Sequence, residues 1–294
     1  MFRIKVADIV MEYDAHHKDF FSERLKSYFY EGDEETDLTF KYEVVKKIEL
    51  PEHKCVKKFK DTFFCTLENG NHFMYLKHPR TGTILTCMEY SSDFSFSHAK
   101  AIHTEPNENV KLTDCDREYL KSGSAFTNRI LYLGGTTLHG SCIEYKGEGV
   151  IFSAPCGTGK STHTSLWEST FPDDVSYIND DKPCIRVRES GITVSGAPWS
   201  GKNYLQSNKT VPLKAIVFLE RSEKNSISIL DTAQALCYLS DQTLKPFYSK
   251  ELGLKNMETI EKIMEKIPVY KLCCNMEPEA AILARDTIFK GESQ

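Results

Sequence analysis

One short run of the sequence has the residue types and spacing needed to bind phosphate groups. Residues 154–161 follow the phosphate-loop pattern G-x-x-x-x-G-K-[ST], with Ala154 in place of the first glycine. Gly157 and Gly159 let the main chain turn so that successive amide N–H groups point at one anion. Lys160 would reach the β- and γ-phosphates of a nucleotide, and the Ser161 hydroxyl would be a ligand of Mg²⁺. The residues predicted to contact the nucleotide are Ala154, Pro155, Cys156, Gly157, Thr158, Gly159, Lys160, Ser161 and Thr162.

Two adjacent carboxylates and one histidine could complete a site for phosphoryl transfer. Asp180 and Asp181 follow the short apolar run at residues 175–178. Side chains alternate across a strand, so both carboxylates could serve one site only at a strand end, where the geometry relaxes. One would then hold Mg²⁺ while the other accepts the proton of an attacking hydroxyl. His139, at the end of an expected strand before Gly140, is the third catalytic candidate.

Each of these features also has an ordinary structural interpretation. The glycine-rich run could be a strand-to-helix turn without a ligand, and Asn-Asp-Asp-Lys-Pro at 179–183 could be a solvated turn. A lone histidine is more often structural than catalytic. The ten cysteines include no CxxC pair, which argues against a zinc site and favours reduced thiols, many of them buried. Cys156 differs because loop amides and Lys160 would lower the pKa of its thiol and make it reactive.

The elements around the loop decide between these interpretations. An apolar strand at 150–153 precedes the loop and a helix opens at 162–168, so the helix N-terminus would add positive charge toward the phosphates. The remaining pattern after residue 136 predicts strands and helices in mixed order. The expected strands are 137–145, 175–178, 184–188, 192–195, 214–219, 226–230 and 269–274, and the expected helices are 231–244, 252–266 and 277–289.

The first part of the chain has a different texture. Short alternating runs predict strands at 4–11, 38–44, 58–67, 72–76 and 83–90, with a helix at 17–30 and a turn at 69–71. These strands would form an antiparallel sheet. A polar stretch at 103–116 precedes an expected helix at 122–134. We therefore expect a β-rich N-terminal domain at 1–125, with a role in recognising an acceptor or partner, and a nucleotide-binding domain at 126–294.

Composition excludes several classes of protein. The chain has 294 residues, 27% of them charged, with a net charge of −5, so no basic excess suggests a nucleic-acid partner. No apolar run approaches the roughly 20 residues needed to span a bilayer. Asp8, Glu12 and Asp14 interrupt any signal-peptide core. We expect a cytoplasmic protein without a membrane or nucleic-acid partner, and composition leaves a homo-oligomer open.

The motifs taken together resemble a known catalytic domain. Leu138-His139-Gly140, the Gly-x-Gly-apolar run at 147–152, the loop at 157–161 and Asn179-Asp180-Asp181 resemble, in order and spacing, the C-terminal domain of HPr serine kinase/phosphorylase. That resemblance covers roughly residues 130–290 and implies an α/β (α+β) phosphate-loop fold shared with phosphoenolpyruvate carboxykinase. Thr162 stands where the bifunctional enzyme has an acidic residue. The segment Gly196-Ala-Pro-Trp-Ser-Gly201 is more similar to the HPr-kinase-related subgroup.

The resemblance also implies roles for individual residues. Asp180 would accept the proton of the acceptor hydroxyl, and Asp181 and Ser161 would lie at the metal. Lys160 would hold the phosphates, and His139 would assist near the transferring group. Apart from the resemblance, the glycines that flank Pro198-Trp199 suggest a rigid loop in which Trp199 and Lys202 lie near a ligand, or else a hairpin tip with one packed aromatic ring.

These observations predict an ATP-dependent kinase that uses Mg²⁺ and phosphorylates a hydroxyl, with serine as the expected acceptor by resemblance. The acceptor would be a protein, a peptide or a small metabolite. The alternative is a nucleotide-binding regulatory module without phosphoryl transfer, for which both aspartates and His139 would be unnecessary. A GTPase is not supported, because the sequence has no convincing Asn-Lys-x-Asp motif for binding guanine. A decarboxylating carboxykinase would need a larger set of metal ligands and basic substrate contacts than we can place in the sequence.

Overall fold

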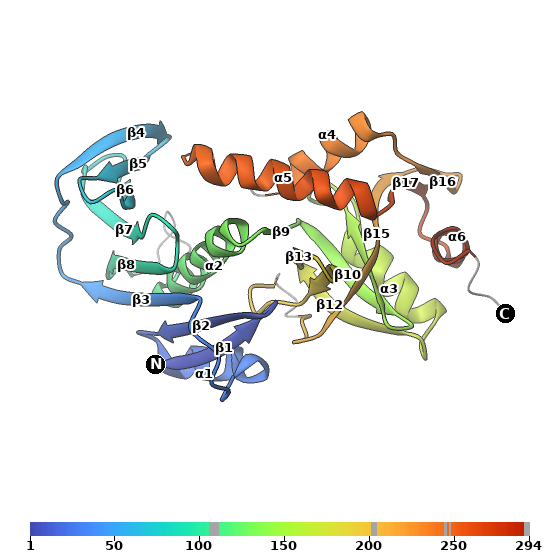
Figure 1. Cartoon of the computed structure of the whole chain (residues 1–294), viewed down its shortest axis with the longest axis horizontal. Coiled ribbons are helices and arrows are strands. Elements are labelled where there is room, and N and C mark those ends of the chain that lie inside the picture. Colours follow the sequence, from blue (N-terminus) through green and yellow to red (C-terminus); the bar gives the residue numbers. More distant parts are fainter. Residues whose placement is uncertain (106–111, 201–204, 244–245, 247, 291–294) are drawn as a thin grey trace. The chain divides into compact units, whose positions relative to one another are not determined.

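The computed structural model describes residues 1–105, 112–200, 205–243, 246 and 248–290. The chain divides into two compact units (Figure 1). Unit 1 contains residues 1–133 and the later segment Pro246–Leu252, and unit 2 contains residues 134–245 and 253–294. The expected boundary lay at 125/126, inside a helix that the structure keeps whole in unit 1.

The described part of unit 1 is built on a mixed sheet of eight strands in the order β1-β2-β3-β8-β7-β6-β5-β4. β3 pairs in parallel with both β2 and β8, so the prediction of a wholly antiparallel sheet was wrong. The strands are β1 (Phe2–Val6), β2 (Ile9–Asp14), β3 (Leu38–Val45), β4 (His53–Phe59), β5 (Thr62–Leu67), β6 (His72–Lys77), β7 (Ile84–Tyr90) and β8 (Phe96–Ile102).

Two predicted strands of unit 1 are hairpins. The run 4–11 is broken by Ala7 and Asp8, which have φ angles of 50° and 58° and form the turn between β1 and β2. The run 58–67 turns at Lys60, with φ 51°, between β4 and β5. None of these three residues is glycine, so the usual sequence signal for such turns is missing. The predicted helix at 17–30 is shorter, with α1 at Lys18–Arg24 and a 3₁₀ turn at Lys26–Tyr28.

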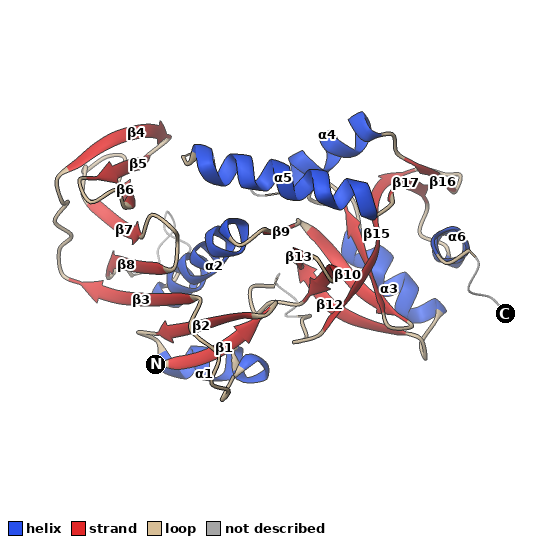
Figure 2. Ribbon diagram, viewed as in Figure 1, coloured by secondary structure: helices blue, strands red, loops and turns tan. Residues whose placement is uncertain are grey.

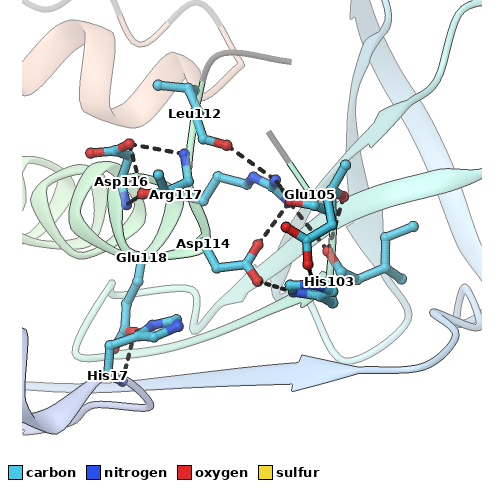
Figure 3. Close-up of polar contacts among 11 residues, drawn as sticks. His17, His103, Glu105, Leu112, Asp114, Asp116, Arg117 and Glu118 are labelled. Carbon is cyan, nitrogen blue, oxygen red and sulfur yellow. Dashed lines mark hydrogen bonds and ion pairs between the residues drawn. The ribbon is translucent and has the colours of Figure 1, made fainter. Parts of the chain in front are cut away.

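Helix α2 (Asp114–Tyr132) covers the sheet of unit 1 at β3 and β8. It begins with a capping box in which Thr113 and Asp116 satisfy each other's main-chain N–H groups. Figure 3 shows this end of the helix together with Glu118, whose side chain is fully buried. The Glu118 carboxylate accepts hydrogen bonds from the main-chain N–H groups of His16 and His17 at 2.9 and 3.1 Å and pairs with the His17 ring. It thereby joins α2 to the chain that follows β2.

The segment Pro246–Leu252 belongs to unit 1 although it lies far along the sequence. The Tyr248 ring stacks on Phe64 of β5 with 5.0 Å between ring centroids and 3° between ring planes. The Tyr248 hydroxyl donates a hydrogen bond to the side chain of Asn128 in α2. This segment therefore packs between the sheet and the helix of unit 1.

Unit 2 holds a second mixed sheet, described as nine strands with the main order β12-β10-β11-β15-β14-β13-β9, and with β17 joining β15 to β16. β11 and β15 are parallel neighbours, as are β15 and β17. The strands are β9 (Gly135–Thr137), β10 (Gly140–Tyr145), β11 (Glu148–Ser153), β12 (Val175–Asp181), β13 (Cys184–Arg188), β14 (Gly191–Ser195), β15 (Thr210–Arg221), β16 (Ser226–Ile229) and β17 (Val269–Cys274).

Helices cover both faces of the central strands of unit 2 (Figure 2). The helices are α3 (Lys160–Thr170), α4 (Thr232–Gln242), α5 (Lys250–Lys266) and α6 (Pro278–Ile288). Along β11, Ile151 packs with residues of α4 and α5, whereas Phe152 packs with residues of α3 and α6. Because both faces are covered, the middle of the strand, residues 150–152, is an unbroken apolar run rather than an alternating one. This layering packs β11, the strand that leads into the loop, on both of its faces.

Candidate functional site

The predicted phosphate loop connects β11 to α3. β11 ends at Ser153, and α3 begins at Lys160 with Gly159 as its N-cap residue. Gly157 and Gly159 have φ angles of 81° and 116°, a region that residues with a Cβ rarely adopt. The strand–loop–helix context expected from sequence is present, and the main chain turns at the two expected glycines.

Arg221, at the end of β15, orients this loop. Its guanidinium donates hydrogen bonds to the main-chain carbonyls of Gly157 and Thr158, at 2.6 and 3.0 Å. Carbonyl oxygens near a bound phosphate would repel it, so engaging them elsewhere favours the anion-binding conformation. Arg221 was not among the residues predicted from the sequence. Its only signal was a cationic residue ending the apolar run of β15, 67 positions after the loop begins at Ala154, and nothing local linked the two.

Lys160 lies folded back on the loop. Its ammonium donates a hydrogen bond to the main-chain carbonyl of Ala154 at 3.0 Å. Burial lowers the pKa of Lys160 below its ordinary value, while Cys156, Asp181 and Asp180 act in the opposite direction. A half-buried ammonium is incompletely solvated, so an anion bound in the loop would stabilise its positive charge.

Ser161 and Asp180 are brought together by β12. The Ser161 hydroxyl donates a hydrogen bond of 2.8 Å to the Asp180 carboxylate, which is 8% exposed. Asp180 is paired with Ser141 in the β10–β12 ladder, and Ser141 in turn bonds Thr164 of α3 at 3.0 Å. The expectation that Asp180 follows a strand was wrong, because β12 runs through both aspartates to Asp181.

Asp181 therefore faces away from Asp180, as alternation along a strand requires. Its carboxylate lies 3.9 Å from Nε2 of His139 and 3.5 Å from the ammonium of Lys182. His139 is oriented by Gln242 at the end of α4, since its Nδ1 lies 3.0 Å from the Gln242 side-chain oxygen and its main-chain N–H donates to the Gln242 carbonyl. This contact holds the imidazole ring with its Nε2 edge toward Asp181. Gln242, like Arg221, was not among the residues predicted from the sequence.

The donors present suit magnesium better than a metal held by the protein alone. Among the described residues, no group of three or more His, Cys, Asp or Glu side chains is arranged to hold a metal ion. Mg²⁺ keeps several waters and is usually bound through one or two carboxylates plus the phosphates of a nucleotide. The Ser161 hydroxyl and the Asp180 carboxylate are oxygen donors of that kind.

The other sequence candidates lie in different environments. Cys156 is exposed in the loop, and all ten cysteines are free. His163 is buried in α3, accepts the Trp167 indole N–H at 3.2 Å, and has its pKa lowered to about 4 by burial, so it is a neutral structural residue. His103 lies in unit 1, where it pairs with Glu105 and Asp114. Trp199 is buried. Lys202 lies outside the described residues.

Two sheets with helices packed against them make this a mixed α/β protein. Residues 124–279, more than half of the chain, match the family described as SynChlorMet cassette protein ScmC. The chain belongs to that family.

The other comparisons give only a distant likeness. The solved structure of the Hpr(Ser) kinase/phosphatase from Coxiella burnetii is similar to this chain at 13% identity, covering 53% of this chain and 99% of that one, with a TM-score of 0.31. No curated protein matches the sequence. No helix within the described residues is long and apolar enough to cross a bilayer.

Proposed function

We propose that the protein is an ATP-dependent kinase that transfers the γ-phosphoryl group to a hydroxyl of a protein, a peptide or a small metabolite. The observation that carries this proposal is the grouping of three features at one edge of the unit 2 sheet. These are a glycine-turned loop opening a helix, a serine hydroxyl bonded to a buried carboxylate, and a histidine beside a second carboxylate.

The loop at 154–162 binds the phosphates in this proposal. Main-chain N–H groups and the amino end of α3 supply partial positive charge, and Lys160 supplies a full charge. Ser161 and one aspartate hold Mg²⁺, which neutralises charge on the phosphates when bound. Transfer then depends mainly on positioning and charge neutralisation, as is general for phosphoryl transfer.

The geometry favours a division of labour between the aspartates that is the reverse of the one implied by resemblance. Asp180 is buried and already bonded to Ser161, so we assign it to the metal. Asp181 is more exposed and faces His139, so we assign it to the proton of the acceptor hydroxyl. His139, held through Gln242, would orient Asp181.

The primary test measures transfer and binding together. The purified full chain is incubated with γ-labelled ATP, Mg²⁺ and a lysate from its source, and the labelled species is identified by mass spectrometry. Lys160→Ala should abolish both labelling and the calorimetric signal of Mg·ATP binding. Lys182→Ala, which removes an exposed cation next to the acidic pair, is the matched control and should retain nucleotide binding.

The outcomes separate the two candidate functions. Labelling that depends on Lys160 supports a kinase. Tight Mg·ATP binding with no labelled species and no turnover would favour the regulatory module instead. Absence of any heat from ATP or GTP with Mg²⁺ would refute both.

A further inference from the structure

A large cavity lies beside the phosphate loop on the face of α3 that does not meet the aspartates. Its volume is about 920 Å³, within the range of roughly 300–1,000 Å³ that small-molecule sites occupy. Thr162, Leu166 and Ser169 line it from α3, one below another at helical spacing. The ends of β15 and β17 supply the opposite wall, including Leu219 and Met276.

The cavity is continuous with the loop that would bind phosphates. Thr158 and Gly159, which belong to the loop, also line the cavity. Ser161 points the other way, to Asp180, while the next residue, Thr162, is exposed to the cavity. A step of one residue along a helix turns the side chain by about 100°. The first turn of α3 therefore lies between the side where Asp180 is found and the side where the cavity is found.

This separation determines which end of a bound nucleotide lies on which side of the first turn of α3. The acceptor hydroxyl must reach the γ-phosphate from the side where Asp181 and His139 lie. The nucleoside must then leave the loop on the opposite side, or it would block the acceptor. The first turn of α3 leads there directly, through Thr162 into the cavity.

The lining chemistry suits a base and a ribose. Leu166, Leu219 and Met276 offer apolar contacts to the faces of a flat ring. The Ser169 hydroxyl and the acidic side chain of Glu223 stand at the wall, and Glu220, whose carboxylate pairs with Lys271, also borders the cavity. Carboxylates accept hydrogen bonds from ribose hydroxyls and from the amino groups of bases, whereas they would repel further phosphates. The cavity therefore favours the uncharged half of a nucleotide.

We propose that this cavity binds the nucleoside of the nucleotide whose phosphates lie on residues 154–162. The inference rests on the proposed function, because it needs a nucleotide in the loop. It adds where base and ribose lie, and it makes Leu166, Ser169 and Met276 determinants of nucleotide affinity.

A second cavity of about 500 Å³ lies on the other side of Arg221 and is the rival location. It is lined by Phe218, Tyr238 and Lys271 and by the first half of the loop. It includes no residue of α3, so a nucleoside there would have to leave the phosphates before the helix begins. Main-chain groups at the start of the helix are the ones that face the phosphates, which favours the first cavity.

The test compares Mg·ATP with Mg·tripolyphosphate by titration calorimetry on the full chain. Tripolyphosphate offers the loop the same charges without a nucleoside. For the wild type we expect ATP to bind at least about tenfold more tightly, which equals about 1.4 kcal/mol. Removing roughly 55 Å² of apolar surface from water would supply that.

Two variants probe the cavity and one probes its rival. Ser169→Trp fills the cavity from an exposed position, and Met276→Ser removes an apolar wall from a side chain that is 71% exposed. Both should leave tripolyphosphate affinity unchanged, which also shows that the loop is folded. Ser169→Trp should reduce the preference for ATP to less than about threefold, and Met276→Ser should reduce it partially. Tyr238→Ala should keep the full preference.

The failures are distinguishable. The inference is overturned if Ser169→Trp keeps a tenfold preference, if Tyr238→Ala erases it, or if the wild type binds both ligands equally. If the wild type binds neither ligand, the phosphate loop itself is refuted and the proposed function falls with it.

Discussion

The two aspartates at the end of β12 give the sharpest test of the site. Asp180→Asn and Asp181→Asn each replace a carboxylate by an isosteric amide, so shape and strand pairing are kept. The buried Asp180 bonds Ser161, whereas Asp181 lies 3.9 Å from His139 and is about a third exposed, at 30% for its side chain. We expect the two variants to fail in different ways.

The magnitudes follow from these positions. A unit charge about 4 Å from the net charge of a metal–phosphate group is worth about 4 kcal/mol at an effective dielectric constant of 20, and about half of that remains at a solvated edge. Asp180→Asn should therefore weaken Mg·ATP binding by about thirtyfold, with little effect on ATP measured in EDTA. Asp181→Asn should leave the Kd of Mg·ATP within about threefold and lower turnover by roughly 100-fold or more, the usual contribution of a general base.

The assay pairs calorimetry, for the Kd with and without Mg²⁺, with steady-state release of ADP. Lys182→Ala, whose ammonium is an exposed neighbour of Asp181, serves as a control for nonspecific charge effects. Our reasoning is refuted if Asp180→Asn binds Mg·ATP normally but loses turnover while Asp181→Asn loses the affinity. That result would restore the division implied by resemblance to HPr kinase. If neither Asp180→Asn nor Asp181→Asn changed binding or turnover, the acidic pair would have no part in the site.

Three further perturbations test the surrounding structure. Arg221→Ala frees the carbonyls of Gly157 and Thr158 and should weaken Mg·tripolyphosphate binding by about tenfold in calorimetry, whereas Arg80→Ala, at an exposed residue of unit 1, should not. Burial lowers the pKa of His163 from 6.5 to about 4. Between these values the unfolded chain binds a proton that the folded protein does not, so stability is full above about pH 6.5 and falls by about 3 kcal/mol as the pH drops through 4. Urea unfolding at several pH values should show this slope, and His163→Gln, which keeps an acceptor for the Trp167 indole, should flatten it; an equal slope in both proteins contradicts the assignment. Glu118→Ala leaves the buried Tyr13 hydroxyl and the main-chain N–H groups of His16 and His17 without their acceptor and should cost about 3–5 kcal/mol in chemical denaturation, against less than about 1 kcal/mol for the exposed Glu105→Ala.

The sequence was most informative where the determinants are local. Gly157, Gly159 and Lys160 lie within one turn of chain, so their spacing alone was enough to predict a strand, a loop and a helix start. Arg221 and Gln242 act on that region through the fold, from the ends of β15 and α4. A single sequence carries no signal for such pairing, because any cation or amide in the chain could have met the loop.

Misplaced elements have comparably specific causes. The extension of β12 through Asn179 and the aspartates was missed because polar residues at a site interrupt the apolar pattern of a strand. β8 was not predicted because its inward residues are Ser97, Ala99 and Ala101, which give a weak alternation. They are small because α2 packs on that strand. Packing against α2 therefore requires small residues on β8, and these residues do not give the apolar alternation by which a strand is predicted.

The return of Pro246–Leu252 to the first unit matters for anyone dissecting this protein. A fragment ending at residue 133 would contain the eight described strands of the unit 1 sheet together with α1 and α2, yet would lack the start of α5 and Tyr248, the partner of Phe64 and Asn128. Exposing the surfaces that Tyr248 covers would favour aggregation. A failure to express could then be mistaken for an inability of unit 1 to fold by itself. A usable fragment would carry residues 246–252 on a short engineered linker, so that Tyr248 can again contact Phe64 and Asn128 within the same chain. The complementary fragment, with 246–252 replaced by a flexible bridge, is the form in which nucleotide binding could be studied in isolation.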